Sequence, residues 1–224
     1  MSLTNLTITN DGKNNLTIVS AAFDECKKLR NISINTKSLT IQNNNFNKIN
    51  GIKSIEIDSD EVIINENCFN DSENLNKIII KSKSLIKVGR SSFNELKCLD
   101  FIEMHGNIII YSEDCFNNSF NSEYESSDNR NISINSESTI SMSNNCFNNL
   151  KCIDSIEISC KDIKIDEKCF NDCFTCENNN SDPKHIKLIS KSTIKIGESC
   201  FINLNYLNHI LITGNEITIE NNSF

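Results

Sequence analysis

The sequence predicts an all-β protein, a right-handed β-solenoid of about 8–9 turns with about 23 residues and two short strands in each turn. Three observations predict this fold class. Phenylalanine recurs at a nearly fixed interval, pairs of isoleucine recur between the phenylalanines with the alternation of a β-strand, and a longer segment of the chain repeats 54 positions later. A period in this range is typical of a stacked array in which each turn contacts only its neighbours.

The phenylalanines predict one buried ring per turn. The intervals between them are 23 or 24 residues, except for two of 31. A small residue, most often cysteine or serine, precedes each of them, which indicates that the backbone turns inward there. Burying one phenylalanine fully stabilises a fold by roughly 1.5–3 kcal/mol, so we expect the rings to stack into an internal ladder. The ladder residues are Phe23, Phe46, Phe69, Phe93, Phe116, Phe147, Phe170, Phe201 and Phe224.

The isoleucines predict the strands. In one turn, Leu29, Ile32 and Ile34 follow the pattern L-x-x-I-x-I, and Leu39 and Ile41 form a second alternating pair. Alternation with a period of two is typical of a half-buried strand, and β-branched residues favour that environment. Turns stacked about 4.8 Å apart then build two parallel sheets that pack face to face.

The 54-residue repeat predicts how the turns are grouped. Residues 93–146 and 147–200 form two double repeats, and we expect the whole chain, residues 1–224, to be a single solenoid domain. Each double repeat contains one 31-residue turn with a polar insertion, at 120–130 and at 174–185. Such insertions often gather on a binding face. The alternative is a neutral surface loop that was copied together with the unit.

Composition and charge disfavour several classes of partner. The net charge is −8 and the pI is about 5.0, without the basic stripe that nucleic-acid binding needs. The longest apolar run, residues 108–111, is far shorter than the roughly 20 residues of a membrane-spanning helix. The N-terminus lacks the basic and apolar regions of a signal peptide. We therefore expect no nucleic acid partner and no membrane insertion by this chain.

No set of residues predicts catalysis, a cofactor or a metal site. The sequence has no nucleophile motif and no glycine-rich phosphate cradle. Glu56, Glu103 and Glu157 recur in one column of alternate turns, which favours a solvated ladder over the acid pair of a glycoside hydrolase. His185 and His209 share a column in adjacent turns, but two ligands make a poor zinc site. We therefore expect no catalytic residues, no cofactor and no metal.

The 11 cysteines predict buried thiols rather than a disulfide framework. Same-column side chains in adjacent turns sit about 4.8 Å apart, whereas a disulfide needs Cβ atoms about 3.8 Å apart. Cys173 and Cys176 form a lone C-x-x-C, and because zinc motifs have two such pairs, we interpret them as packed or loop thiols. Unpaired thiols fit a reducing compartment better than secretion. Five cysteines directly precede ladder phenylalanines: Cys68, Cys115, Cys146, Cys169 and Cys200.

The repeat also carries a more specific pattern, over nearly the whole chain. Its best examples are Leu75-x-x-Ile78-x-Ile80 with Val88-Gly89 and Phe93, Ile194-x-Ile196-Gly197-Glu198-Ser199-Cys200-Phe201, and Ala21-Ala22-Phe23-Asp24-Glu25-Cys26. At these residues the chain resembles the BspA-type leucine-rich repeats, a family of surface antigens. It lacks the family's proline after the first strand and most glycines before the phenylalanine. It also lacks the asparagine ladder that ordinary leucine-rich repeats keep after the strand. The resemblance implies a leucine-rich-repeat-like solenoid that adheres to host proteins or cells, without catalytic residues.

The outward positions of the first strand in each turn predict a binding face. They lie directly before, between and after the two core residues of that strand, and they stack in columns. All 3 histidines lie there, together with four apolar residues at positions that should face water, which indicates an interaction site. The alternative is a set of scattered surface residues. The predicted face consists of Glu56, Ile79, Phe101, Glu103, His105, Glu157, His185, Lys187, Ile189, His209 and Leu211.

We expect a non-catalytic recognition or adhesion array whose partner is a host protein or a second copy. The resemblance implies display on the cell surface or secretion. The alternative is a cytoplasmic interaction scaffold, which the unpaired cysteines and the absent signal peptide favour. A carbohydrate-processing enzyme is disfavoured, because acidic and basic residues do not cluster on one turn. No polar cap follows Phe224, so we expect a piece of a longer array or an end covered by a partner. Open strand edges there favour end-to-end self-association.

Overall fold

All regular structure is β-strand in the described part of the chain, residues 3–10, 14–23, 25–121, 129–176 and 183–224 of the computed structural model. No helix long and apolar enough to cross a membrane occurs in those ranges. The strands are β1 (Asn5–Thr9), β2 (Asn15–Ile18), β3 (Asn31–Ile41), β4 (Ser54–Ile64), β5 (Lys77–Val88), β6 (Phe101–Tyr111), β7 (Asn131–Met142), β8 (Ser155–Ile165), β9 (His185–Ile196), β10 (His209–Thr213) and β11 (Glu216–Ile219).

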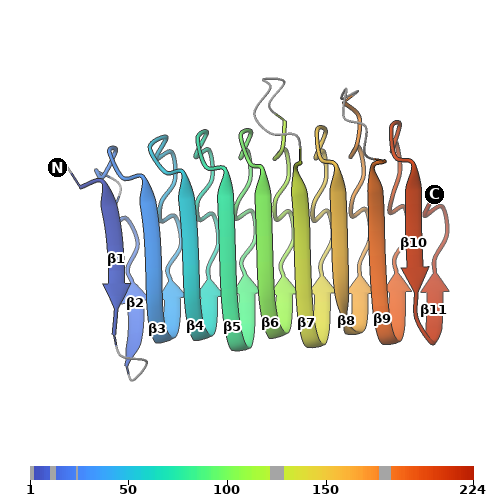
Figure 1. Cartoon of the computed structure of the whole chain (residues 1–224), viewed down its shortest axis with the longest axis horizontal. Helices are drawn as coiled ribbons and strands as arrows, with labels where there is room; N and C mark the ends of the chain where they lie inside the picture. Colours follow the sequence, from blue (N-terminus) through green and yellow to red (C-terminus); the bar gives the residue numbers. More distant parts are fainter. Residues whose placement is uncertain (1–2, 11–13, 24, 122–128, 177–182) are drawn as a thin grey trace.

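The strands form a solenoid in which every pairing is parallel. They follow the order β1-β3-β4-β5-β6-β7-β8-β9-β10, while β2 pairs with β3 and β11 with β9. Each turn therefore hydrogen-bonds only to the turn before and the turn after. Figure 1 shows strands descending on the near side and returning on the far side as the chain advances from the N-terminal to the C-terminal end, so the coil is right-handed. The predicted fold class is confirmed.

One detail differs from the prediction of two short strands per turn. In β3 to β9 the two expected strands are halves of one strand of 11 or 12 residues. A bend joins the halves, and a small buried residue such as Ser59 or Ser136 sits there. The Ser136 hydroxyl donates to the carbonyl of Thr139 at 3.1 Å, which satisfies a backbone group at the bend. We call the outward side of the first halves, with β1 and β10, the first face, and that of the second halves, with β2 and β11, the second face.

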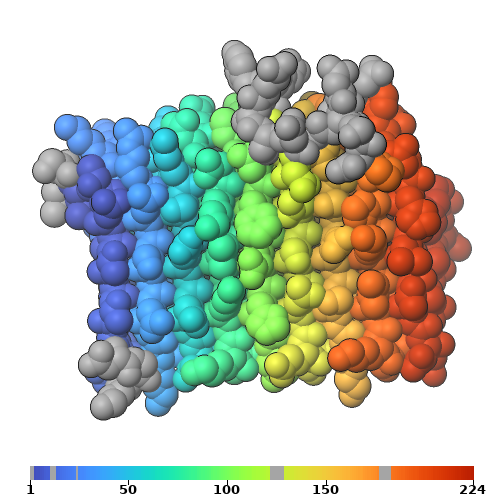
Figure 2. Space-filling view, viewed as in Figure 1, coloured from blue at the N-terminus to red at the C-terminus, as the bar shows by residue number. Residues whose placement is uncertain are grey.

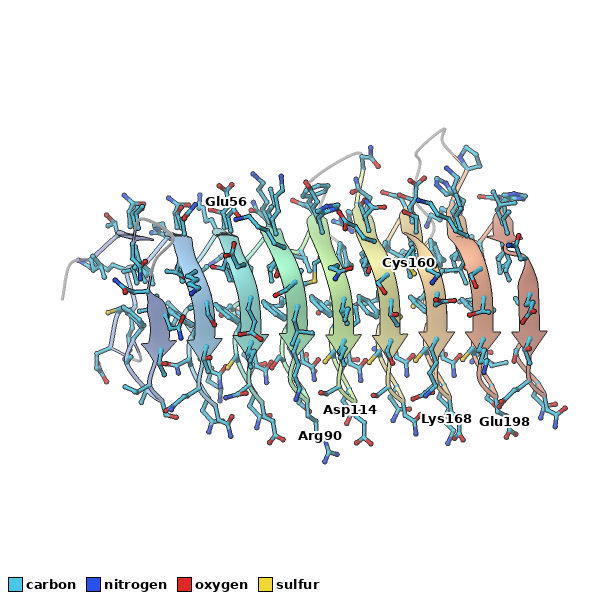
Figure 3. The ribbon with its side chains drawn as sticks, turned by 90° about the horizontal axis from the view of Figure 1, so that it is seen from below. Glu56, Arg90, Asp114, Cys160, Lys168 and Glu198 are labelled. Atoms are coloured by element: carbon cyan, nitrogen blue, oxygen red, sulfur yellow. A yellow bond between two sulfur atoms is a disulfide. The ribbon has the colours of Figure 1, made fainter. Side chains whose placement is uncertain are left out.

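The phenylalanine ladder is present as predicted. Successive rings from Phe23 to Phe224 are stacked, with centroids between 4.8 Å (Phe46–Phe69) and 5.5 Å (Phe147–Phe170) apart. The ladder occupies the turn that leads from the second half of one strand to the next coil. Figure 3 shows Arg90 and Lys168, which belong to this ladder turn, on the opposite side of the coil from Glu56 of the first face. The rings therefore close the side of the core that the strands leave open.

The backbone of the ladder turn is unusual, because alternate residues are left-handed. In one turn φ is 54° at Asn67, 62° at Phe69 and 54° at Asp71. This conformation costs a non-glycine residue about 1–2 kcal/mol. Bonds to both neighbouring turns hold it: the Phe69 N–H donates to the Asn45 carbonyl at 3.0 Å, and the Asn67 N–H donates to the Arg90 carbonyl at 2.9 Å. Stacked rings and lateral hydrogen bonds together fix a conformation that no single turn would keep.

An asparagine ladder follows the phenylalanine ladder, one residue later in the chain. The Oδ1 atom of each asparagine accepts the backbone N–H at the same place in the next turn, for example from Asn70 to Asn47 at 3.0 Å. This ladder was not predicted, because the asparagine ladder of ordinary leucine-rich repeats follows the strand, whereas these asparagines lie beside the rings. Its members are Asn47, Asn70, Asn94, Asn117, Asn148 and Asn171.

The cysteines that precede ladder phenylalanines are buried free thiols, as predicted. Their Sγ atoms donate to carbonyls of the preceding turn; Cys146 reaches Ser112 at 3.0 Å and Cys169 reaches Ser143 at 3.2 Å. Burial raises the pKa of the Cys68 thiol to about 11. These residues therefore act as small core side chains whose weak donors are satisfied.

Replacing Phe93 by alanine tests the ladder, with Phe224→Ala as the control at the same place in the repeat. Phe93 is fully buried between two rings, whereas Phe224 is 63% exposed and stacks on Phe201. We expect Phe93→Ala to lower the free energy of unfolding by about 3–5 kcal/mol and Phe224→Ala by about 1 kcal/mol. Urea denaturation followed by circular dichroism measures both. Equal losses would contradict a ladder that carries the stability of the coil.

Candidate recognition surface

The first face places the predicted binding residues in columns. The strand register aligns Glu56 with Ile79 and Ile79 with Glu103, and it aligns His185 with His209. All eleven residues of the predicted face lie at outward, exposed or partly exposed positions of first halves or of β10. Figure 2 views this side of the molecule, and the first halves follow one another across it without a break. That these residues bind a partner stays a prediction.

The predicted residues fall into two groups rather than one. β7 separates them, with the polar residues Asn131, Ser133 and Asn135 at its outward positions. The β4–β6 group consists of Glu56, Ile79, Phe101, Glu103 and His105. The β8–β10 group consists of Glu157, His185, Lys187, Ile189, His209 and Leu211.

In the β4–β6 group, lysines of β5 neutralise the two glutamates. Lys77 Nζ lies 2.8 Å from Glu56 Oε1, and Lys81 Nζ lies 3.4 Å from Glu103 Oε1. Exposed ion pairs of this kind contribute about 0–1 kcal/mol to stability. These ion pairs also leave the half-buried Phe101 in surroundings with little net charge. Carboxylates held by lysines in this way fit the solvated ladder that the sequence predicts.

In the β8–β10 group, Glu157 is the centre of a small polar cluster. Its Oε1 accepts from Lys187 Nζ at 2.6 Å and lies 3.1 Å from His185 Nε2. The Lys187 hydrogen bond, and then that of His185, lowers the pKa of the Glu157 carboxyl. Beside this cluster Ile189 is 42% exposed and Leu211 is 38% exposed. Apolar and charged side chains therefore alternate over a small area.

The histidine and the cysteine that were considered as metal ligands have other partners in the structure. No group of three or more histidine, cysteine, aspartate or glutamate side chains among the described residues could hold a metal ion. His185 faces Glu157 through Nε2 and the Pro183 carbonyl through Nδ1, at 3.2 Å. Cys173 points into the core, where its Sγ donates to the Phe147 carbonyl at 3.1 Å.

A disulfide joins Cys152 and Cys176, which corrects the interpretation of Cys176 as a free thiol. The two residues are 24 positions apart, one turn of the coil, and their Cα atoms are 5.0 Å apart. Cys176 stands at the start of the second insertion, outside the regular columns on which the spacing argument rested. The counterparts 54 positions earlier are Cys98 and Ser122, so only one double repeat has the pair. Residues 122–128 and 177–182 of the two insertions lie outside the described residues.

A ladder of alternating charge along the edge of the first face was not predicted from the sequence. It consists of the residues directly before β6, β7, β8 and β9, namely Asp100, Arg130, Asp154 and Lys184. Arg130 Nε lies 3.7 Å from Asp100 Oδ1, and the backbone N–H of Arg130 donates to Asp154 Oδ2 at 2.8 Å. Arg130 is 7% exposed and Lys184 is 6% exposed. Alternating charge at one register position in four successive turns was the available signal.

The charge ladder holds both insertions where they join the coil. Arg130 ends the first insertion, and Lys184 lies at the end of the second. The Lys184 ammonium donates to the Cys176 carbonyl and lies 5.8 Å from the centroid of the Tyr206 ring. Loss of hydration on burial lowers the pKa of Lys184; Asp154 opposes this shift, and Arg130 adds to it. The disulfide and the buried lysine thus fix both ends of the second insertion on the coil.

Comparison with protein families matches this chain to one described as BspA type Leucine rich repeat region. The match covers residues 1–123 and 121–224, with 6 copies of the repeat. Comparison with curated proteins and with solved structures finds no match.

Asp154→Ala tests the charge ladder. It removes the carboxylate that lies between two buried cations, so we expect the free energy of unfolding to fall by about 3–5 kcal/mol. Asp58→Ala is the control, because Asp58 is exposed on the first face, and such a surface change costs about 0.5 kcal/mol or less. Thermal and urea unfolding measure both. An equally small loss of unfolding free energy in both variants would show that the charge ladder does not hold the ends of the insertions.

Proposed function

The chain belongs to the family of BspA-type leucine-rich repeats, and from this premise we propose that it is a non-catalytic recognition and adhesion array that binds a protein partner through the first face. One observation carries the proposal. Apolar residues occupy outward positions of the first face in four turns, where the repeat elsewhere places polar ones. These residues are Ile79, Phe101, Ile189 and Leu211.

The repeat supplies its own comparison for these positions. The column of Ile79 otherwise carries residues such as Ser33, Glu56 and Ser133. Because the coil continues unchanged through those polar turns, the fold does not require an apolar residue there. An apolar residue kept at a solvent-facing position is typical of a surface that is covered by a partner.

The geometry of the face favours a folded protein as that partner. Every first half between β1 and β10 is hydrogen-bonded on both sides, so a peptide cannot add a strand within the face. Contacts must therefore come from side chains over a broad, flat area, which suits another protein surface. Apolar residues with paired charges around them give such an interface its centre and its polar rim.

Cysteine chemistry supports display on the cell surface or secretion. A disulfide such as Cys152–Cys176 persists in oxidising compartments. Eight of the other nine cysteines are buried, and burial protects thiols from oxidants. An intracellular scaffold is the second candidate, and the nine unpaired cysteines favour it. Adhesion to a host remains what the family implies, and it is proposed on that basis.

A triple variant of the face tests the proposal. Phe101→Ser, Ile189→Ser and Leu211→Ser together should weaken binding of the labelled chain to intact cells and to immobilised extracellular-matrix proteins by at least tenfold, about 1.4 kcal/mol or more. The matched control is Asn35→Ser, Asn135→Ser and Thr213→Ser, at polar positions of the same face, which should bind like the unchanged chain. A triple variant that still binds every one of these probes fully would remove the first face from the proposal.

Counting thiols distinguishes the two locations. In protein alkylated under denaturing conditions at lysis of its own cells, without reductant, display outside the cell predicts nine alkylated cysteines, whereas an intracellular scaffold gives eleven. In the folded protein we expect rapid reaction with a disulfide reagent at Cys98 only. It is the one partly exposed free thiol among the described residues, and burial raises the pKa of the Cys173 thiol to about 12. Eleven alkylated cysteines without reductant would place the protein inside the cell.

A further inference from the structure

The second face carries an apolar patch on three consecutive strands. We call it the second-face patch; it consists of Ile63 of β4, Leu85 of β5, and Ile108 and Ile110 of β6. Ile108 is 36% exposed, and the other three are partly exposed. The register aligns Leu85 with Ile108, and Lys87 with both Ile63 and Ile110. The four apolar side chains therefore surround Lys87.

The coil does not require apolar residues at these positions. Turns on either side of the patch carry polar or charged residues in the same two columns, and they coil in the same way. The equivalent residues are Ser38 and Thr40 in β3, Thr139 and Ser141 in β7, Asp162 and Lys164 in β8, and Thr193 and Lys195 in β9. The patch is thus a local departure from the repeat and not a part of its core.

Two charges at the patch lack an ionic partner within the described residues. Lys87 is exposed and forms no salt bridge there. Glu61 stands next to Leu85 in the register and accepts only a hydroxyl hydrogen bond, from Ser38 at 3.0 Å. A partner that covers the patch must offer apolar side chains, an anion near Lys87 and a cation near Glu61.

We propose that this partner is a second copy of the chain, packed second face to second face about a two-fold axis parallel to the long axis of the solenoid. Such an axis places each strand over its own counterpart running in the opposite direction, so the two outward columns exchange places. Ile108 then lies over Ile110 of the second copy. Leu85 lies over Lys87 of the second copy, whose ammonium reaches Glu61 on the adjacent strand.

The same axis pairs charges elsewhere on the second face. It places Asp162 of β8 over Lys164 of the second copy, and the reverse, because these residues occupy the two exchanged columns. Opposite charges thus meet at β8 as well as at β4 and β5, while the apolar centre lies over itself. Four apolar residues make a small interface, so the dimer forms and dissociates readily.

The dimer leaves both first faces free, pointing in opposite directions. One assembly would then hold two copies of the recognition surface, and a partner displayed densely on a cell would be bound through both. The dimer itself does not depend on the proposed function, because it uses other residues and is measured by mass rather than by binding.

Sedimentation equilibrium of the full chain, up to about 1 mM because small interfaces associate weakly, tests the proposal. We expect a reversible approach to twice the 25.4 kDa of one chain. Glu61→Lys alone and Lys87→Glu alone should each raise the dissociation constant by at least tenfold, about 1.4 kcal/mol. A 1:1 mixture of the two variants should restore the dimer, because one variant then carries two cations where the other carries two anions. Ile108→Asp should abolish dimerisation alone and in every mixture.

Lys48→Glu is the matched control. It makes the same charge change at an exposed residue of a ladder turn, where another turn carries Glu95, and it should dimerise like the unchanged chain. Circular dichroism and melting temperature confirm that each variant is folded. A monomer at all concentrations would overturn the proposal, as would single charge variants that dimerise normally. A mass that grows beyond two chains would also overturn it and would indicate open-ended, end-to-end association instead.

Discussion

Lateral register between turns is the constraint on which this molecule depends. Each ladder ring lies on the ring of the turn before, and the backbone around it is left-handed at alternate residues. That backbone costs about 1–2 kcal/mol for each left-handed residue. An isolated turn could not hold it, because the ring contacts and the backbone hydrogen bonds that offset this cost come from the neighbouring turns. The same stacking places every residue in line with its equivalents in those turns.

The interval between phenylalanines was enough to predict the coil, because a ring can be buried once per turn only if the turns stack. The alternation around Ile32 and Ile34 then fixed which side chains point outward, and the columns of the first face followed. That the two halves of each turn form one continuous strand was not predicted, because a serine such as Ser59 or Ser136 is equally compatible with a corner between two strands and with a bend inside one. Cys152 and Cys176 were missed because the insertion takes Cys176 out of the regular spacing.

Both binding surfaces proposed for this chain rest on departures from its own repeat. The core uses one side of every strand, and the outward side is free to vary from turn to turn without loss of the coil. Phe101 on the first face and Ile108 on the second are visible as unusual only because other turns show what the fold accepts at those positions. The alternating charges of Asp100, Arg130, Asp154 and Lys184 are a third departure. The two cations, Arg130 and Lys184, lie in the turns that carry insertions, where a longer connection must be held against the coil, and the two carboxylates lie in the turns directly before them.

The asparagine ladder constrains how a chain of this kind can grow. Each amide serves the backbone of the turn that follows, so a new turn must receive that bond and offer its own amide onward. A duplicated stretch that begins and ends at the same position of the repeat carries both the asparagine that accepts this bond and the backbone N–H that donates it. An unrelated segment carries neither. The 54-residue repeat is a duplication in phase. Copying whole turns therefore lengthens the array without interrupting its asparagine ladder.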